Sequence, residues 1–240
     1  ALLPRLPELL RDAPAMARSH GIDGALVLHQ RDVNRNGRID AVAGEHRWLL
    51  FGLGRGGPRY YAIDLALIDD PRLLWSLELD DAQLEARANP VVTRLPVAGS
   101  GQSAGYWVVL FAGGYDPRFD ATRAEGRGAG AVLRLVDAAS GRTLWSAGGP
   151  ESDLPLAGLA SLAAAPRALD LDGDGNLDRA YALDVTGSLW RFDFAESRAP
   201  AEAATARRIA RLGTGEQRWF ATPDVSVVGK GPASRLAIAA

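Results

Sequence analysis

The chain has 240 residues, of which 47% are hydrophobic and 23% charged, and this balance excludes a disordered protein and allows one large or two small domains. The formal net charge of −2 provides no basic surface for nucleic acid or an anionic membrane, so we expect neither as a partner. The absence of cysteine excludes disulfides and cysteine-ligated metals, and no apolar run reaches the ~18 residues that would span a bilayer.

Residues 1–23 open the chain, and the helix-like apolar spacing within them predicts a helical or linker lead-in. Residues 24–240 predict a β domain, because β-branched and aromatic residues alternate between clusters of Gly, Asp, Asn and Pro. A four-strand pattern recurs in this part of the chain. The first strands are expected at 24–32, 89–97, 163–172 and 222–229, the second at 48–54, 106–114, 178–187 and 235–240, the third at 60–66, 131–141 and 188–194, and the fourth at 73–79, 143–149 and 206–213.

Four strands in each unit of roughly 60 to 75 residues predict an all-β fold, a modified β-propeller of four-stranded blades. The fourth unit stops after its second strand, so the chain accounts for about three and a half blades. Closed propellers have roughly four to eight blades, and we therefore expect residues 24–240 to be part of a larger propeller.

The first unit carries an acidic turn, DVNRNGRID, at residues 32–40. Its spacing matches a calcium loop, in which positions 1, 3, 5, 7 and 9 supply oxygen ligands and position 6 is glycine, here Gly37. The candidate ligand positions are Asp32, Asn34, Asn36, Arg38 and Asp40. Neutral amides replace two carboxylates and two arginines lie in the loop, so the predicted site is weak, and a hairpin turn held by Asx hydrogen bonds explains the pattern equally well.

Two glycine-rich motifs resemble enzyme signatures but stand in the wrong context. GLGRGG (52–57) matches GxGxxG, yet a strand follows it where a dinucleotide site needs a helix, so we predict a strand–strand turn. GQSAG (101–105) matches the GxSxG nucleophile elbow but also precedes a strand. We predict no catalytic residues and expect that the protein is not an enzyme.

Three tryptophans, Trp75, Trp145 and Trp190, recur within the repeat. In VDAASGRTLW (136–145), Asp137, Gly141 and Trp145 are spaced by four residues. We interpret this pattern as blade-to-blade docking, in which the glycine permits the turn and the tryptophan packs on a neighbouring blade. Propeller dehydrogenases that use a quinone share this kind of docking, so the pattern reports architecture more than activity.

The acidic turn DLDGDGNLD, at residues 170–178 of the third unit, is the strongest functional signal. The expected ligands are Asp170, Asp172, Asp174, Asn176 through its carbonyl, and Asp178. Four carboxylates within nine residues repel one another unless a cation lies among them, and oxygen ligands without nitrogen or sulfur favour Ca²⁺ over zinc or copper. Position 12 is Tyr181 rather than the glutamate of an EF-hand, so the loop is predicted to be a calcium-binding β-turn.

The order of five motifs resembles the propeller domain of the PilY family of type IV pilus assembly and adhesion proteins. The first motifs, ALLPRLPELL (1–10) and FGLGRGGPRYYAIDL (51–65), are followed by NPVVTRLP (89–96) with WVVLFAGGY (107–115), then VDAASGRTLW and the long motif DLDGDGNLDRAYALDVTGSLWRFDF (170–194). The resemblance implies a modified propeller that binds Ca²⁺ at residues 170–178. It also implies a calcium-dependent role in opposing pilus retraction and in surface adhesion. The family's N-terminal adhesin region and its first blade have no counterpart in this sequence.

The implied partners are pilus subunits or pilus assembly proteins, with host or abiotic surfaces as further targets. The implied location is outside the cytoplasm, at the cell surface or on the pilus after passage through the periplasm and outer membrane. Two alternatives stay open from the sequence. One is a quinone-dependent dehydrogenase built on similar blades, and the other is an interaction scaffold in which calcium is only structural.

Overall fold

In the computed structural model of the protein, the described residues are 7, 20–95, 106–120, 128–195, 202, 204–214, 217–228 and 235–239. The GQSAG motif and most of the predicted 1–23 lead-in lie outside these residues. The described part is built from fifteen strands and two short 3-10 turns, and it contains no helix long and apolar enough to cross a membrane.

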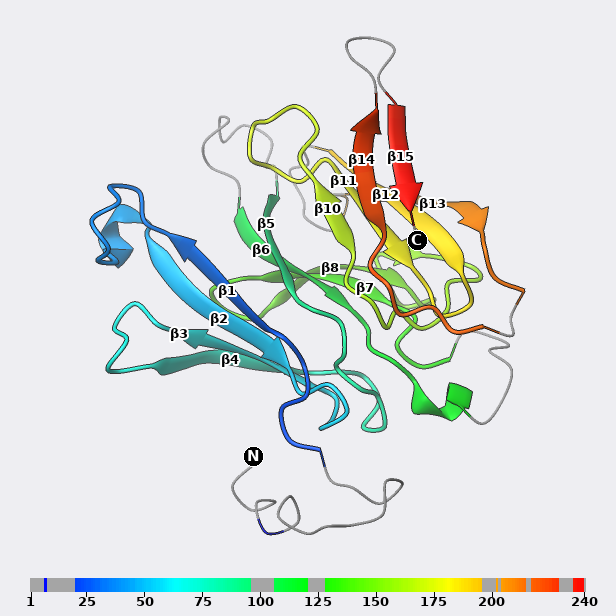
Figure 1. Ribbon diagram of the computed structural model, residues 1–240, viewed down its shortest axis with the longest axis horizontal. Helices are drawn as coiled ribbons and strands as arrows, with labels where there is room; N and C mark the ends of the chain where they lie inside the picture. The colour runs from blue at the N-terminus through cyan, green and yellow to red at the C-terminus, as the bar shows by residue number, and fades with distance from the viewer. Residues whose placement is uncertain are drawn as a thin grey trace.

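The strands form three large, mainly antiparallel sheets and one half sheet, here called blades 1 to 4 (Figure 1). Blade 1 comprises β1 (Leu26–Arg31), β2 (His46–Gly52), β3 (Arg59–Asp64) and β4 (Arg72–Glu78). Blade 2 comprises β5 (Val91–Leu95), β6 (Tyr106–Ala112), β7 (Leu133–Asp137), β8 (Thr143–Gly148) and the short β9 (Leu154–Pro155). Blade 3 comprises β10 (Arg167–Leu169), β11 (Arg179–Leu183), β12 (Ser188–Phe194) and β13 (Ala204–Arg211).

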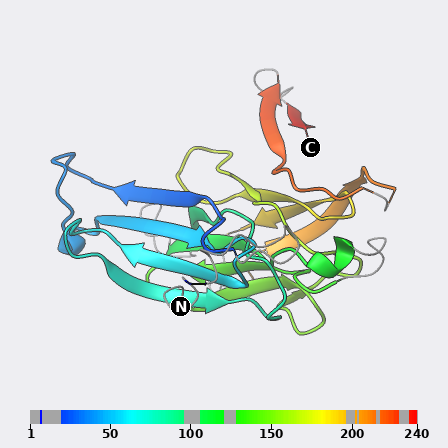
Figure 2. The same cartoon turned by 60° about the horizontal axis from the view of Figure 1, so that its bottom comes forward.

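Blade 4 is the hairpin of β14 (Asp224–Val228) and β15 (Arg235–Ala239), which projects from the rest of the molecule in Figure 2 and packs Val225 and Ile238 against the core of blade 3. Between the described strands, no pairing joins blade 4 to blade 1. The prediction of three and a half four-stranded blades is therefore confirmed. The sequence did not indicate β9, which pairs with β8 in parallel through only two residues.

Blade 1 has two unlike faces because neighbouring side chains on a strand alternate between them. The row Leu50, Ala62 and Trp75 crosses β2, β3 and β4 and is buried against blade 2. On the other face, Leu28 and Leu73 are 58% and 62% exposed. The GLGRGG segment makes the β2–β3 turn, as predicted, with Gly54 at φ 60°.

Trp75 and Trp145 each dock their own blade on the next one along the chain. The indole N–H of Trp75 donates to the Ala138 carbonyl of blade 2 at 2.8 Å. Trp145 lies edge-on to Phe192 and Phe194 of blade 3, with ring centroids 6.3 and 5.7 Å away. These contacts confirm the predicted docking role for both tryptophans.

Trp190 also packs on a neighbouring blade, as predicted, but from another strand and on the preceding neighbour. It lies on the third strand of its sheet, β12, rather than on the fourth. It belongs to the core between blades 2 and 3, together with Ala182 and Phe192, so it faces the preceding blade rather than the next. The spacing of tryptophans along the sequence did not separate these two positions.

Asp184 is a buried carboxylate at the end of the β11–β12 hairpin, with an exposed fraction of 0%. One oxygen accepts hydrogen bonds from the backbone N–H groups of Thr186 and Ser188, both at 3.0 Å, and from the Thr186 hydroxyl at 2.6 Å. The other accepts from the Trp190 indole at 3.0 Å and from the Ala160 N–H at 3.3 Å. Asp184 therefore holds three parts of the structure together through hydrogen bonds: the β11–β12 hairpin, the indole of Trp190, and the segment around Ala160 that connects blade 2 to blade 3.

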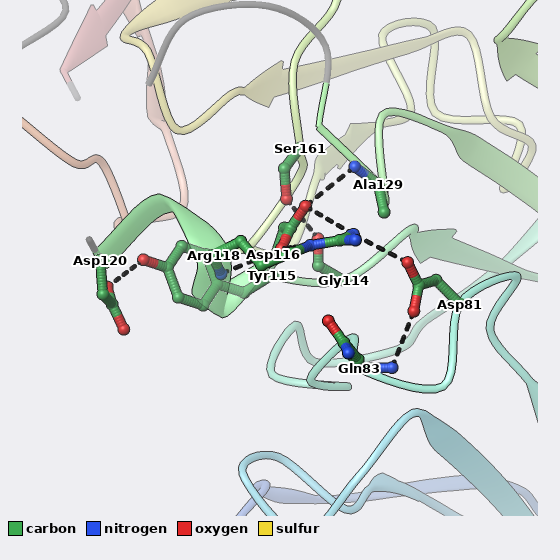
Figure 3. A network of polar contacts seen from close by, with 9 residues as sticks. All are labelled: Asp81, Gln83, Gly114, Tyr115, Asp116, Arg118, Asp120, Ala129 and Ser161. Atoms are coloured by element: carbon green, nitrogen blue, oxygen red, sulfur yellow. Dashed lines mark hydrogen bonds and ion pairs between the residues drawn. The ribbon is translucent and has the colours of Figure 1, made fainter. Parts of the chain in front are cut away.

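A layer of loops links the three sheets (Figure 3). Arg118, in the 3-10 turn η4 (Pro117–Asp120), makes ion pairs with Asp116 and Asp81, each at 2.7 Å, and Asp81 lies between blades 1 and 2. The Ser161 hydroxyl donates to the Gly114 carbonyl at 2.7 Å and joins blade 2 to the segment before blade 3. These polar contacts hold the blades together at their loop ends.

Two histidines, the buried His46 and the half-buried His29, lie where blade 1 meets blade 2. His46 stacks on Trp48 with ring centroids 3.6 Å apart, and His29 lies 4.8 Å from the Trp107 ring. The Nε2 atoms of both histidines are buried without a hydrogen-bond partner among the described residues. Burial lowers the pKa of both rings, and that of His46 falls to about 4, helped by His29 and Arg31 nearby. The pair is therefore neutral at pH 7.

We expect acid to destabilise this interface. A histidine whose folded pKa lies below its unfolded value of about 6.5 gives full stability above pH 6.5, and this stability falls as the pH drops toward 4. Between pH 7.5 and 4.5, His46 should reduce the free energy of unfolding by about 2 to 3 kcal/mol, measured by urea unfolding in EGTA. The His46→Phe variant, which keeps a ring on Trp48, should lose less stability over the same range. An equal loss in both proteins would contradict the assignment.

Candidate metal centre

The loop of residues 170–178 connects β10 to β11 and is closed at its base by the Asp178 N–H, which donates to the Leu169 carbonyl at 3.0 Å. Gly173 and Gly175 have φ values of 86° and 87°, in the left-handed region that glycine adopts without steric cost. The two glycines reverse the backbone twice and turn the loop back on itself. The loop joins the first and second strands of blade 3, which is where the repeat pattern of the sequence places it.

Three of the predicted ligands come together in the structure. Asp170, Asp172 and Asp174 each place a carboxylate oxygen within 4.8 Å of the others. Calcium–oxygen distances are about 2.3 to 2.6 Å, so two ligands of one ion lie at most about 5 Å apart. The spacing of these three carboxylates therefore suits a single Ca²⁺.

Backbone N–H groups hold these carboxylates in place. Asp170 accepts from the N–H groups of Gly173 and Gly175 at 2.7 and 2.8 Å. Asp174 accepts from the Asn176 backbone at 2.7 Å and from its side-chain amide at 2.8 Å. The hydrogen bonds from Asn176 lower the pKa of Asp174, with a smaller contribution from the positive charge of Arg94. Asp174 is thus ionised at neutral pH, as a calcium ligand must be.

Asn176 is buried, with 5% of its surface exposed, and its Oδ1 has no hydrogen-bond partner among the described residues. A buried carbonyl oxygen without a partner is costly, and a cation is one of the groups that can satisfy it. The sequence assigned Asn176 a role through its backbone carbonyl. The unpartnered side-chain oxygen is a further oxygen donor at the same position.

Asp178 is not one of the three carboxylates brought within 4.8 Å of one another. One of its oxygens accepts a hydrogen bond from the Leu171 N–H across the mouth of the loop. Its role as a ligand stays a prediction, and the contact that the structure shows for it closes the loop.

Arg94 on β5 of blade 2 lies beside this loop, which the sequence did not predict. Its backbone carbonyl accepts from the Leu177 N–H at 2.8 Å, and its Nη1 lies 3.4 Å from the position that a Cβ would take on Gly175. The guanidinium carbon lies 5.8 Å from the centre of the Trp107 ring. The acidic loop of blade 3 is therefore packed against a cation of blade 2.

The second predicted loop, residues 32–40, folds in a similar way at its start. Asp32 accepts from the N–H groups of Asn36 and Gly37 at 3.2 and 2.8 Å, and Asn34 accepts from the Asn36 N–H at 3.0 Å. Gly37 has a φ of 77°. The Asx hydrogen bonds expected of a hairpin turn are therefore present. The carboxylates of this loop are not among the groups that gather as possible metal ligands in the described chain.

The two loops differ at position 9. Asp40 caps the 3-10 turn η3 (Ala41–Ala43) by accepting from the Val42 N–H at 2.9 Å. Glu45, which the sequence analysis missed, accepts from the N–H groups of Val33 and Asp40, both at 2.9 Å. Glu45 therefore bonds the position 2 N–H, as Asp178 does in the other loop. It lies beyond the nine-residue pattern, so loop spacing alone could not reveal it.

Comparison with known proteins gives these features a family context. The family model described as the PilY1 beta-propeller domain matches residues 11–213. The chain belongs to this family. Among curated relatives, the type IV pilus biogenesis factor PilY1 of Pseudomonas aeruginosa strain UCBPP-PA14 is 33% identical over 150 residues, which cover 62% of this chain and 11% of that protein. The PilY1 homolog of Xylella fastidiosa is 28% identical over 159 residues, or 60% of this chain and 9% of that protein.

The fold is also similar to the crystal structure of the Pseudomonas aeruginosa PilY1 C-terminal domain, with a TM-score of 0.60 and 23% sequence identity. That match covers 85% of this chain and 41% of the crystallised chain. This likeness supports the propeller architecture. The predicted family and the all-β propeller fold are thus confirmed, and the chain spans only a small part of its curated relatives.

The donor set of this PilY1-family propeller suits calcium. The three gathered carboxylates and the unpartnered Asn176 Oδ1 are all hard oxygen donors. The ion would supply positive charge that cancels the repulsion between the aspartates. The loop residues themselves provide the preformed turn, because their backbone hydrogen bonds already orient the carboxylates.

Proposed function

We propose that this PilY1-family propeller binds Ca²⁺ at residues 170–178 and serves type IV pilus biogenesis as a calcium-responsive binding domain. The observation that carries the proposal is the gathering of Asp170, Asp172 and Asp174, next to Asn176, whose side-chain amide bonds Asp174 and whose Oδ1 has no partner among the described residues. The names of the curated relatives, type IV pilus biogenesis factors, support the pilus context. We propose pilus subunits or assembly proteins as partners and an exported, pilus-associated location.

In this proposal calcium acts through the order of the loop. Backbone hydrogen bonds already shape the turn, and the ion would stabilise it further by cancelling the repulsion between the carboxylates, which gives a more rigid surface between blades 2 and 3. A ligand changes a protein's conformation only through different affinities for two states, and the loaded loop would be the state that partners bind. Calcium would in this way modulate pilus extension, retraction and surface attachment.

Calcium binding is tested by a matched pair of substitutions at position 1 of the two loops. Asp170 and Asp32 each accept the N–H of the loop glycine at 2.8 Å, so Asp170→Ala and Asp32→Ala remove the same local hydrogen bond. We expect Asp170→Ala to abolish calcium binding in isothermal titration, because it removes one of the three gathered carboxylates. Asp32→Ala should leave this binding intact. Unchanged affinity in Asp170→Ala would show that the site is assigned wrongly.

Melting curves with calcium and with EGTA extend the same test. An ion that binds only the folded state raises the melting temperature by mass action, and Asp170→Ala should lose that increase. Binding to purified pilus subunits, measured with and without calcium, then separates a calcium-responsive surface from a purely structural ion. Equal subunit binding in both conditions would contradict the responsive role.

A further inference from the structure

Arg94 has an unusual position for a charged side chain. Its Nη2 is buried without a hydrogen-bond partner, and Arg94 makes no ion pair with any residue that the structure describes. Arg94 as a whole is half-buried, but a guanidinium nitrogen that is buried without a hydrogen-bond partner carries a desolvation cost. Something near the guanidinium must offset this cost.

Two features of the structure can do so. The face of Trp107 lies 5.8 Å from the guanidinium carbon, within the range of a cation–π interaction. The acidic loop is close on the other side, where Nη1 lies 3.4 Å from the Cβ position of Gly175. The guanidinium therefore lies in the field of the loop carboxylates without bonding any of them directly.

We infer that Arg94 is the built-in cation of this loop, offsetting part of its negative charge when it holds no metal and setting its calcium affinity by repelling the bound ion. The inference rests on the proposed calcium site. A fixed positive charge offsets part of the repulsion between the aspartates in the empty state. The same charge opposes a divalent ion when it arrives, so the loop is tuned to respond only when calcium is abundant.

The position of Arg94 also gives the loop a connection to the rest of the propeller. Arg94 belongs to β5 of blade 2, the loop belongs to blade 3, and Trp107 lies at the contact between blades 1 and 2. The guanidinium therefore lies between the loop and the Trp107 ring. This chain of contacts links the loop to the blade 1 interface through one side chain.

The test is a calcium titration by isothermal calorimetry of the wild-type chain and of two neutral variants, Arg94→Gln and Arg94→Met. Both should bind calcium about three- to tenfold more tightly at low ionic strength, and the gain should shrink in 0.5 M salt as the charge is screened. Arg94→Lys keeps the charge and should stay near the wild-type affinity. Arg94→Met keeps an apolar stem on Trp107, so it separates the loss of charge from the loss of packing.

Arg208→Gln is the matched control. Arg208 also lies over a tryptophan, with its guanidinium carbon 6.0 Å from the Trp190 ring, but it is on β13, which β12 separates from the loop strand β11. The Arg208→Gln variant should bind calcium with the affinity of the wild type. Near-ultraviolet circular dichroism checks that each variant is folded.

The outcomes separate the two proposals. Wild-type binding with unchanged or weaker affinity in both neutral variants overturns the role of Arg94 alone. An equal gain in Arg208→Gln also overturns it, because the effect would then be one of net charge. A wild-type chain that binds no calcium overturns the calcium site and, with it, this inference.

Discussion

Replacing Asp184 with alanine is expected to lower the free energy of unfolding by about 3 to 5 kcal/mol, among the largest effects for any single residue of the chain. The carboxylate is fully buried and accepts five hydrogen bonds. Its removal leaves buried donors without partners, including the Trp190 indole and the Ala160 N–H, and each such donor carries a desolvation cost. Urea unfolding in EGTA measures the loss without a contribution from calcium.

Asp137 provides the comparison for this prediction. It occupies a turn of blade 2 and accepts from the N–H and hydroxyl of Ser140 at 2.7 and 2.6 Å, but it is only partly buried. Water can replace those bonds, so Asp137→Ala should cost about 1 kcal/mol. Asp184→Asn should fall between the two, because an amide keeps one acceptor oxygen. Similar losses for Asp184→Ala and Asp137→Ala would contradict the central role of Asp184.

The second large effect is expected at Gly141, the turn residue on which Trp75 of blade 1 rests. A Cβ at this position would lie 2.6 to 2.9 Å from the Cβ, Cγ and Cδ2 atoms of Trp75, and the φ of 75° is already unfavourable for other residues. Gly141→Ala should therefore reduce the free energy of unfolding by about 3 kcal/mol or more. The fluorescence of the buried Trp75 should change at the same time, since the indole has to move.

Two other glycines separate the cost of the positive φ from the cost of the clash with Trp75. Gly37 has nearly the same φ, 77°, but a Cβ there would meet nothing within 4 Å, so Gly37→Ala should cost about 1 to 2 kcal/mol. Gly149 has neither constraint, and Gly149→Ala should be close to neutral. The excess of Gly141→Ala over Gly37→Ala measures the contact with Trp75. No excess would mean that the two blades adjust around the added methyl group.

Most of the fold was predictable because local patterns determine it. Alternating apolar residues fixed the strands, and the glycine and aspartate clusters fixed the turns between them. The strand β9 was not predicted because it consists of Leu154 and Pro155 alone, and two residues are too few to show an alternating apolar pattern. Trp190 packs on the preceding blade whereas Trp75 and Trp145 pack on the following one, a difference that was not predictable because spacing along the chain does not tell which face of a sheet a side chain takes after a change of strand.

The site was predictable to the extent that it is local. The aspartates at positions 1, 3 and 5 of the 170–178 loop could be found because a turn brings near neighbours together. Arg94 and Glu45 could not be found in this way. Arg94 reaches the loop from another blade, 76 residues before Asp170, and Glu45 lies outside the motif of its own loop. Their roles follow from the packing of sheets, which no short pattern encodes.

The tryptophan docking also gives the propeller a direction. Trp75 of blade 1 packs on blade 2, and Trp145 of blade 2 packs on blade 3. Each of these two tryptophans is therefore covered by the blade that follows its own in the chain. A polypeptide that appears N-terminus first, during synthesis or passage through a membrane, leaves each tryptophan exposed until its successor has formed. A blade therefore remains exposed to aggregation or proteolysis until the following blade has folded. We expect the interfaces between blades to form one after another along the chain.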